Sequence, residues 1–391
     1  MDGTEEGKPR MRIVIFDTCY RQFLARYYAT NPEIALGSFD NQRHSLLSQF
    51  FGTSDFYSRH LNKLGWEAHD LIGNCVPLQM AWARENDFHI GELSLKIPHR
   101  FFRVPLIGPL LSSMPGLLDV AVAQIRQLKP DVLYCQDLSF FPSRILKEMR
   151  SDIRLIVGQI ASPLPPSDFL SGYDLILTSF PHFVDRIRAL GIRSEYFRIA
   201  FERRVLDELG VVEKNIDVSF VGGISAHHKN AIPVLEHLAR NTNIAFFGYG
   251  ARNLPQGSPI LAAHQGEVWG LDMYRALARS RITINRHIAV AENYANNMRL
   301  YEATGVGSLL LTDRKTNLGE LFVEGREVVT YSDAHNAVEQ INRLLQAPDE
   351  MSQIAAAGQR RTLGEHTYEH RMRELIGILE HHIDGHRGTH E

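Results

Sequence analysis

The stretch Asp217-Val-Ser-Phe-Val-Gly-Gly223 decides the fold, because it is an apolar run of strand length that ends in two glycines. Such a run predicts a buried strand over 218–221, and the glycines predict a tight turn from that strand into a helix. The pattern recurs towards the end of the chain, where apolar runs predict strands at 244–247, 282–285, 309–312 and 328–331. Helical patterns separate these runs, and this alternation is typical of a parallel sheet covered by helices.

The residues before this stretch show the same alternation, which begins at Arg12-Ile-Val-Ile-Phe16. A helix is predicted over 181–191, with Val184, Ile187 and Leu190 on one face. The strands predicted in this half lie at 12–16, 67–72, 131–135, 153–158, 174–178 and 195–199.

The two series of strands predict two Rossmann-like, doubly wound α/β domains that face a central cleft, at 11–205 and 216–365. The polar stretch 202–215 is interpreted as a linker about which the domains close on their ligands. Residues 1–10 are polar and are expected to form a disordered tail. A C-terminal helix predicted over 366–384 carries an apolar stripe, which we expect to pack back toward the first domain.

Composition excludes several classes of protein. Of the 391 residues, 44% are hydrophobic and 22% are charged, so the chain can bury a core and wholesale disorder is excluded. The net charge of -3 gives no reason to expect a nucleic acid partner. The three cysteines form no C-x-x-C pair, and the histidines show no metal-ligand spacing. We therefore expect no metal site and a cytoplasmic protein.

The turn Gly222-Gly223 and the lysine after it, Lys229, are the first candidates for chemistry. Glycines without side chains let a phosphate approach the backbone, and Lys229 supplies positive charge, so the turn can cradle a diphosphate. A tight strand-to-helix turn with a solvated lysine would have the same local sequence, and both interpretations stay open.

The second candidate is Asn296-Asn-Met-Arg-Leu-Tyr-Glu-Ala-Thr-Gly-Val-Gly307. Arg299 and Glu302 are three residues apart and share one face of a helix, where the arginine can bind phosphate and the glutamate can accept hydrogen bonds from a ribose. The alternative is a surface ion pair that binds no ligand. If Glu302 holds a ribose, we expect Glu302→Ala to weaken nucleotide binding and to leave folding little changed.

The second half resembles the C-terminal donor domain of GT-B glycosyltransferases, most closely the CgeB-like group of spore-maturation-protein-like enzymes. The resemblance rests on the order and spacing of several motifs. They are Asp217-Val-Ser-Phe-Val-Gly-Gly, Phe247-Gly-Tyr-Gly, Gly266-Glu-Val-Trp-Gly-Leu-Asp-Met-Tyr, Ser280-Arg-Ile-Thr-Ile-Asn, Asn297-Met-Arg-Leu-Tyr-Glu and His366-Thr-Tyr-Glu-His-Arg371.

The resemblance implies a donor site for a nucleotide sugar. Glu302 corresponds to the residue that holds the donor ribose, and Lys229 and Arg299 correspond to the basic residues that hold the diphosphate. Val268 and Trp269 lie in the segment that flanks the nucleobase, although Trp269 fits a buried packing position equally well. The remaining positions of the predicted donor site are Gly222, Gly223, Gly248 and Asn297.

One position departs from the family pattern. Many retaining GT-B enzymes carry an E-x7-E pair, but the residue eight before Glu302 is Tyr294, and the nearby acid Glu292 is ten before it. Either the role of the first glutamate has moved, or this group works without it. We expect retention of configuration, although the motif does not decide the outcome.

The first half, with Phe51-Gly-Thr-Ser-Asp-Phe-Tyr-Ser58 and Tyr134-Cys-Gln-Asp137, resembles an acceptor domain. If the reaction inverts, a general base must lie near the acceptor hydroxyl, and Asp17, Asp55 and Asp137 are the candidate loop carboxylates. Aspartate is also common in turns and caps, so each of them has a structural alternative.

The segment Lys96-Ile-Pro-His-Arg-Phe-Phe-Arg103 mixes cations with aromatic residues. It either docks on an anionic membrane or a lipid-linked or polymeric acceptor, or it forms an ordered loop with solvated arginines.

The sequence therefore predicts a metal-independent glycosyltransferase whose donor is a UDP-, GDP- or dTDP-linked sugar and which needs no other cofactor. The acceptor stays open among glycans, lipids, small molecules and proteins, and we expect at most peripheral contact with a membrane. One alternative is a GT-B-fold protein that binds a nucleotide sugar without turnover. The other is a nucleotide-sugar epimerase.

Overall fold

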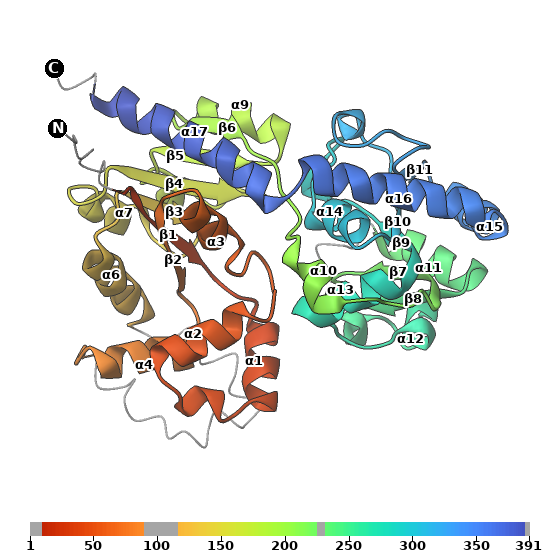
Figure 1. The fold of residues 1–391 in the computed structure, drawn as a ribbon, viewed down its shortest axis with the longest axis horizontal. Helices are drawn as coiled ribbons and strands as arrows, with labels where there is room; N and C mark the ends of the chain where they lie inside the picture. The colour runs from red at the N-terminus through yellow and green to blue at the C-terminus, as the bar shows by residue number, and fades with distance from the viewer. Residues whose placement is uncertain (1–9, 90–115, 225–230, 388–391) are drawn as a thin grey trace, which may run out of the picture. The chain divides into compact units, whose positions relative to one another are not determined.

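The structure is a computed structural model that describes residues 10–89, 116–224 and 231–387 (Figure 1). The chain divides into two compact units. Unit 1 comprises residues 1–178, 184–195 and 372–391, and unit 2 comprises residues 179–183 and 196–371. Each unit has its own sheet.

Unit 1 contains a six-stranded sheet in the order β2-β1-β3-β4-β5-β6, in which β1 to β5 pair in parallel. Residues Ile13 to Phe16 are at most 3% exposed. Both faces of β1 are therefore covered, as in other parallel sheets that lie between helices. The strands are β1 (Arg12–Asp17), β2 (Glu67–Ile72), β3 (Val132–Cys135), β4 (Leu155–Ile160), β5 (Leu175–Thr178) and β6 (Arg193–Tyr196).

Helices flank the sheet of unit 1 (Figure 1). From Met372 onward the last helix belongs to this unit, and its residues Met372, Leu375 and Leu379 are fully buried. The apolar stripe predicted for this helix is therefore its buried face. The helices are α1 (Arg21–Thr30), α2 (Phe39–Leu47), α3 (Phe56–Lys63), α4 (Val76–Glu85), α6 (Leu117–Leu128), α7 (Ser143–Met149), α8 (Ser167–Leu170), α9 (Pro181–Ala189) and α17 (Tyr368–Arg387).

Unit 2 contains a five-stranded parallel sheet in the order β11-β10-β9-β7-β8. Leu309, Leu310 and Leu311 of β10 are fully buried, which again places helices on both faces. The strands are β7 (Ile216–Val221), β8 (Ile244–Phe247), β9 (Ser280–Asn285), β10 (Leu309–Asp313) and β11 (Val329–Tyr331). The helices are α10 (Arg204–Leu209), α11 (Ile232–Asn241), α12 (Pro259–Ala263), α13 (Gly270–Arg279), α14 (Met298–Gly305), α15 (Ala334–Gln346) and α16 (Pro348–Glu365).

All strands predicted from the sequence are present; most differ from the prediction at one end by one or two residues, and β4 and β6 differ at both ends. β4 continues to Ile160, because Gln159 is held inside the sheet by the hydroxyls of Tyr57 and Tyr134, which donate to its Oε1 at 2.9 and 2.8 Å. β6 ends at Tyr196, and the chain beyond it pairs elsewhere, since Phe201 N donates to the carbonyl of His366 at 2.9 Å.

Two further expectations differ from the structure. α9 ends at Ala189 and Leu190 is 54% exposed, so the prediction that Leu190 shares the buried face was wrong. Phe183 and Ile187 form that face instead. The polar stretch 202–215 lies inside unit 2, where it forms α10 and the approach to β7. The chain has already passed from unit 1 into unit 2 before this stretch, between Glu195 and Tyr196.

Candidate functional site

Each sheet has a switch point, where successive strands are added on opposite sides of the first one. It lies between β1 and β3 in unit 1 and between β7 and β9 in unit 2. Ligands of open α/β sheets bind outside the carboxyl ends of the strands at such a point. The loops that follow these four strands are therefore the candidate site of each unit.

The loop after β7 packs backbone to backbone against the loop after β8. Gly222 N donates to the carbonyl of Phe247 at 2.9 Å, and Ile224 N donates to that of Tyr249 at 2.8 Å. Gly248 has φ +132°, and a Cβ there would lie 2.0 Å from the carbonyl oxygen of Gly222. Only glycine fits at position 248. The contacts between the two loops bring the predicted residues Gly222, Gly223 and Gly248 together. Lys229 lies outside the described residues.

The predicted base-flanking residues lie beside this turn. The rings of Trp269 and Tyr249 are stacked, with centroids 5.4 Å apart and planes inclined by 10°. Trp269 and Val268 are both partly exposed, so Trp269 is not the buried packing residue that the sequence left open. Sequence reasoning missed Tyr249 as part of this surface, although its motif Phe247-Gly-Tyr-Gly was noted.

Asn297 begins α14 as its N-terminal cap. Its side chain accepts from Leu300 N at 3.2 Å, and its Nδ2 donates to Asn285 Oδ1 at 2.8 Å. Asn285 ends β9, and its Nδ2 donates in turn to Thr312 Oγ1 on β10 at 2.9 Å. The start of α14 is therefore tied to the carboxyl ends of two neighbouring strands.

Arg299 and Glu302 form an ion pair on α14, with 2.7 Å between Nη1 and Oε2. Their side chains are only 14% and 5% exposed, so the pair is buried and is not the surface pair considered from the sequence. Arg299 also lies against Met273 of α13, and the hydroxyl of Tyr274 is hydrogen-bonded to Glu302. Burial raises the pKa of Glu302, and the Arg299 charge and the Tyr274 hydroxyl oppose that rise.

The loop between β9 and α14 contains His287, whose contact with Asp313 sequence reasoning missed. The backbone N and Nδ1 of His287 both donate to Asp313 Oδ1, at 3.1 and 2.7 Å, and Lys315 Nζ lies 3.3 Å from Asp313 Oδ2. Burial by itself would raise the pKa of Asp313, but His287 and Lys315 lower it to about 2. The carboxylate thus anchors the loop at the end of β10. Only the strand register, which sequence spacing does not show, brings His287 and Asp313 together.

In unit 1 two of the three predicted carboxylates meet at the switch point. Thr18 Oγ1 donates to Asp137 Oδ2 at 2.8 Å, and Thr18 N donates to Asp17 Oδ1 at 2.7 Å. Thr53 Oγ1 lies 3.3 Å from Asp17 Oδ2 and 2.6 Å from Gln136 Oε1. Asp17 and Asp137 therefore form one polar cluster with side chains from three loops.

Asp17 has the electrostatics of a proton acceptor near neutral pH. Burial raises its pKa to about 7, and Asp137 adds to the rise while Thr18 N and Thr53 oppose it. Asp55 is separate, because it occupies the cap position of α3, where it lies 3.9 Å from Arg59. Of the three candidates, Asp55 is thus the one at a helix cap position, although its side chain makes no capping hydrogen bond.

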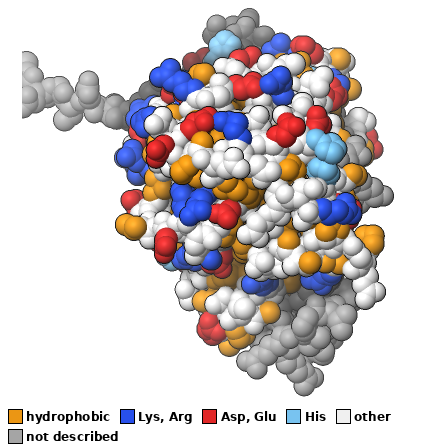
Figure 2. Space-filling model, turned by 90° about the vertical axis from the view of Figure 1, so that its right-hand side faces the viewer, with side chains coloured by type: hydrophobic (Ala, Val, Ile, Leu, Met, Phe, Trp, Pro, Cys, Tyr) orange, Lys and Arg blue, Asp and Glu red, His pale blue; other side chains and the backbone are white. Residues whose placement is uncertain are grey.

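No group of three or more His, Cys, Asp or Glu side chains with the arrangement of a metal site occurs in the described part of the chain. No helix among the described residues has the length and apolar composition needed to cross a membrane. On the face of the molecule shown in Figure 2, acidic and basic side chains are interspersed, and neither sign gathers into a patch.

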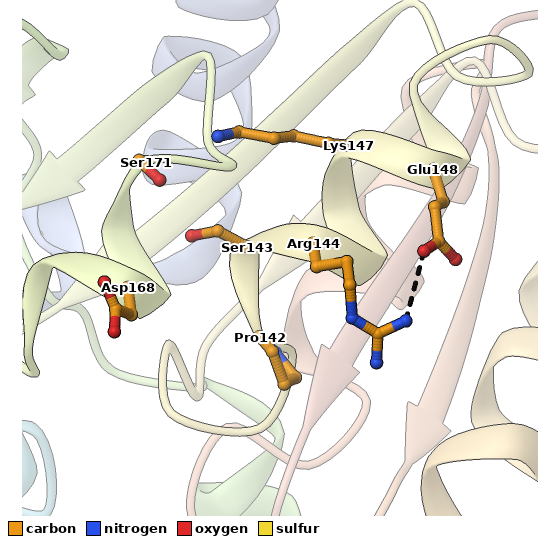
Figure 3. A pocket seen from close by; sticks show the side chains of 7 residues that line it. All are labelled: Pro142, Ser143, Arg144, Lys147, Glu148, Asp168 and Ser171. Carbon is orange, nitrogen blue, oxygen red and sulfur yellow. Dashed lines mark hydrogen bonds and ion pairs between the residues drawn. The ribbon is translucent and has the colours of Figure 1, made fainter.

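Figure 3 shows a surface pocket of about 640 Å³ in unit 1, between α7 and α8. Lys147, Ser143 and Ser171 point toward the gap between the helices, while Arg144 turns away and pairs with Glu148 at 3.2 Å. The pocket contains none of the predicted site residues, so its volume alone does not mark it as the active site. The predicted segment Lys96–Arg103 lies outside the described residues.

Comparisons with known proteins bear on both units. Residues 232–377 match a family model described as glycosyl transferase-like. Among proteins with curated descriptions, none matches the sequence significantly. The solved structure of Anabaena HepE in complex with UDP and glucose is 11% identical with a TM-score of 0.58, over 95% of this chain and 100% of that chain.

Two further solved structures are similar over nearly the full length. Sucrose-phosphate synthase from Thermosynechococcus elongatus is 10% identical with a TM-score of 0.58, over 95% of this chain and 99% of that chain. A glycosyltransferase from Rickettsia africae is 11% identical with a TM-score of 0.58, over 96% of this chain and 99% of that chain. The chain has the GT-B fold. Two α/β units with parallel sheets were predicted from the sequence, and this fold class is confirmed.

Proposed function

We propose that this protein is a glycosyltransferase of the CgeB-like group, which transfers a sugar from a nucleotide-sugar donor to an acceptor. The observation that carries the proposal is the buried Arg299–Glu302 pair on α14, the helix that follows the switch-point strand β9. This helix lies within residues 232–377, which match a glycosyl transferase-like family model. HepE was crystallised with UDP and with UDP-glucose, which makes UDP the first nucleotide to test.

In this proposal unit 2 binds the donor. Arg299 already pairs with Glu302, but a carboxylate has several lone pairs, so Glu302 retains the capacity to accept hydrogen bonds from the ribose hydroxyls. The glycine turns let the diphosphate approach the backbone, and Arg299 and Lys229 supply its counter-charge without a metal ion. Val268 and the stacked rings of Trp269 and Tyr249 would flank the base.

Unit 1 binds the acceptor in the same proposal. Asp17 accepts a hydrogen bond from the acceptor hydroxyl, and Asp137 helps to keep the pKa of Asp17 near neutral. We propose retention of configuration as the outcome, whereas a buried carboxylate of this kind would also serve as the base of an inverting enzyme. An NMR spectrum of the product anomer decides between the two outcomes. The free cysteines of the described residues support a reducing, cytoplasmic environment.

The test is a thermal-shift screen against UDP, GDP and dTDP and their sugars, followed by transfer assays with and without EDTA. A nucleotide at 100 times its Kd should stabilise the fold by about 2.7 kcal/mol, and transfer should survive EDTA. A protein that binds the sugar nucleotide and neither transfers nor hydrolyses it would instead be a binding protein. The tyrosine at position 294, in place of the first glutamate of the E-x7-E pair, is compatible with such a loss of turnover. A changed sugar configuration in the recovered donor would identify an epimerase.

A further inference from the structure

The pocket between α7 and α8 in unit 1 has the size and composition of a small-molecule site (Figure 3). Its volume of about 640 Å³ lies within the range of about 300–1,000 Å³ that ligand pockets occupy. Ser143 and Lys147 are four residues apart on α7, so they share one face of that helix. Asp168 lies on α8, and Ser171 follows directly after that helix. The pocket therefore brings polar side chains from two helices to one place.

Ser143 has an unsatisfied hydroxyl in the wall of this pocket. The residue is 6% exposed, and its Oγ is buried without a hydrogen-bond partner. Buried polar groups in folded proteins nearly always have such a partner. Figure 3 shows that the side chain points toward the gap between the helices. A serine hydroxyl turns about a single bond, so a ligand that enters the pocket can supply the missing partner.

The two sides of the pocket are packed tightly against each other. A Cβ on Gly172 would lie 2.7 Å from Leu146 Cβ and 3.1 Å from Ser143 Cα, so the chain after α8 lies directly on α7. Arg150, which follows α7, reinforces this contact. Its Nη2 pairs with Asp174 Oδ1 at 2.7 Å and donates to the carbonyl of Gly172 at 3.3 Å. These contacts hold the polar side chains of the pocket at a constant spacing.

The charged side chains that line the pocket cancel in pairs. Arg144 and Glu148 form an ion pair at 3.2 Å, which leaves one cation, Lys147, and one carboxylate, Asp168. In the described part of the chain, no residue forms a hydrogen bond or an ion pair with either of these two side chains. The pocket thus offers a ligand an ammonium group and two serine hydroxyls as donors and a carboxylate as acceptor.

We propose that this pocket binds a carbohydrate and that the carbohydrate is a sugar unit of a glycan acceptor, outside the unit that reacts. Each sugar hydroxyl both donates and accepts hydrogen bonds, as the mixture of groups in the pocket requires. An uncharged ligand also matches a lining without net charge. Carbohydrate binding stands independently, whereas the assignment to the acceptor rests on the proposed function, in which unit 1 holds the acceptor.

The competing explanation is an anion site, in which Lys147 and the serine hydroxyls bind a phosphate group. Asp168→Ala separates the two explanations. A sugar loses a charge-assisted hydrogen bond in this variant and binds more weakly, whereas an anion loses a repulsive neighbour and binds more tightly. Lys147→Met removes the ammonium group and keeps an unbranched side chain. Lys63→Met on α3 is the matched control, because it removes an exposed lysine elsewhere in unit 1.

Binding would be measured without nucleotide, by saturation-transfer NMR titration of maltotriose, cellotriose, N,N′,N″-triacetylchitotriose and mannotriose. Calorimetry would measure inorganic phosphate. We expect the wild type to bind at least one of the saccharides, and the tightest of them is used for all variants. Its Kd should rise at least tenfold in Lys147→Met and Asp168→Ala and less than twofold in Lys63→Met. Ser143→Ala should weaken binding without lowering the melting temperature, because Oγ has no partner in the protein to lose.

Three results would overturn carbohydrate binding at this pocket. They are the failure of all four saccharides to bind the wild type, a wild-type Kd in both Lys147→Met and Asp168→Ala, and phosphate binding that tightens in Asp168→Ala. The bound saccharide should also serve as acceptor, with a KM that rises at least tenfold in Lys147→Met. A protein that transfers sugar only to other acceptors would refute the assignment to the acceptor. A protein that binds no nucleotide and transfers nothing would instead contradict the proposed function, and the nucleotide-free titrations would still decide carbohydrate binding.

Discussion

The burial of the Arg299–Glu302 pair leads to a prediction that a surface pair would not fulfil. Glu302→Gln leaves the Arg299 guanidinium, whose side chain is only 14% exposed, without its counter-charge. Removing one partner of a buried ion pair costs about 3–5 kcal/mol, and the partial exposure of Arg299 places our expectation near the lower end, at about 3 kcal/mol. In a unit of this size, that loss lowers the melting temperature by roughly 6–12 °C.

The companion variants turn this value into a test of the pair. Arg299→Met should destabilise the protein by a similar amount, because it leaves the Glu302 carboxylate buried beside Tyr274. The double variant should be more stable than the sum of the two losses predicts, since it leaves no unpaired charge. Chemical denaturation followed by circular dichroism gives the free energies, and calorimetry on the folded variants gives the nucleotide Kd.

Two outcomes would refute this reasoning. If each single variant melts within about 2 °C of wild type, the ion pair contributes no more to stability than an exposed pair, and the conclusion that it is buried is wrong. If Glu302→Gln is destabilised but binds the nucleotide with wild-type affinity, the pair is structural and Glu302 does not hold the ribose. A loss of tenfold or more in affinity is the expected result, which corresponds to about 1.4 kcal/mol.

Three further predictions follow from other sites. Ionised Asp17 should be needed for transfer, so kcat/KM should rise with pH through about 7. Asp17→Asn should lose this pH dependence and Asp55→Asn should keep it. A rise that persists in Asp17→Asn would exclude Asp17 as the proton acceptor. Burial lowers the pKa of His366 from 6.5 to about 4, so between these pH values the native state binds fewer protons than the unfolded state. The free energy of unfolding should therefore fall by roughly 3 kcal/mol as the pH drops from 6.5 to 4. Chemical denaturation of His366→Gln should show a flatter pH dependence. Gly248→Ala should destabilise the protein by about 2–3 kcal/mol in chemical denaturation, because the added methyl group would collide with the carbonyl of Gly222. Gly257 has open space around it, so Gly257→Ala should change stability by less than about 0.5 kcal/mol. Equal effects of the two substitutions would disprove the close contact between Gly248 and Gly222.

The strands could be predicted because they are buried on both faces. Runs such as Ile13 to Phe16 and Leu309 to Leu311 contain almost no polar residue, and helix patterns lie between them. The ends of β4 and β6 could not be predicted in the same way. They depend on partners distant in sequence, such as the tyrosine hydroxyls that hold Gln159 and the His366 carbonyl that holds Phe201.

The candidate site was predictable in its parts but not in its surroundings. The spacing of Arg299 and Glu302 places them on one face of a helix, but it does not show that α13 covers that face with Met273 and Tyr274. The expectation that loss of Glu302 leaves folding little changed therefore conflicts with the structure, because the carboxylate is buried and paired. Likewise, sequence spacing treats Asp17, Asp55 and Asp137 alike, and only the strand order separates Asp55 from the other two.

The discontinuity of unit 1 has a consequence for how the protein is made. The ribosome finishes all of unit 2 before it produces the residues from Met372 onward, which complete unit 1. At typical bacterial or eukaryotic rates of synthesis, the interval from Glu195 to Met372 lasts about 10–35 s. During that time the nascent first sheet lacks the helix that contributes Leu375, Leu379 and Ile383 to its core. Chaperones that recognise exposed apolar surface therefore have a defined period in which to bind the growing chain.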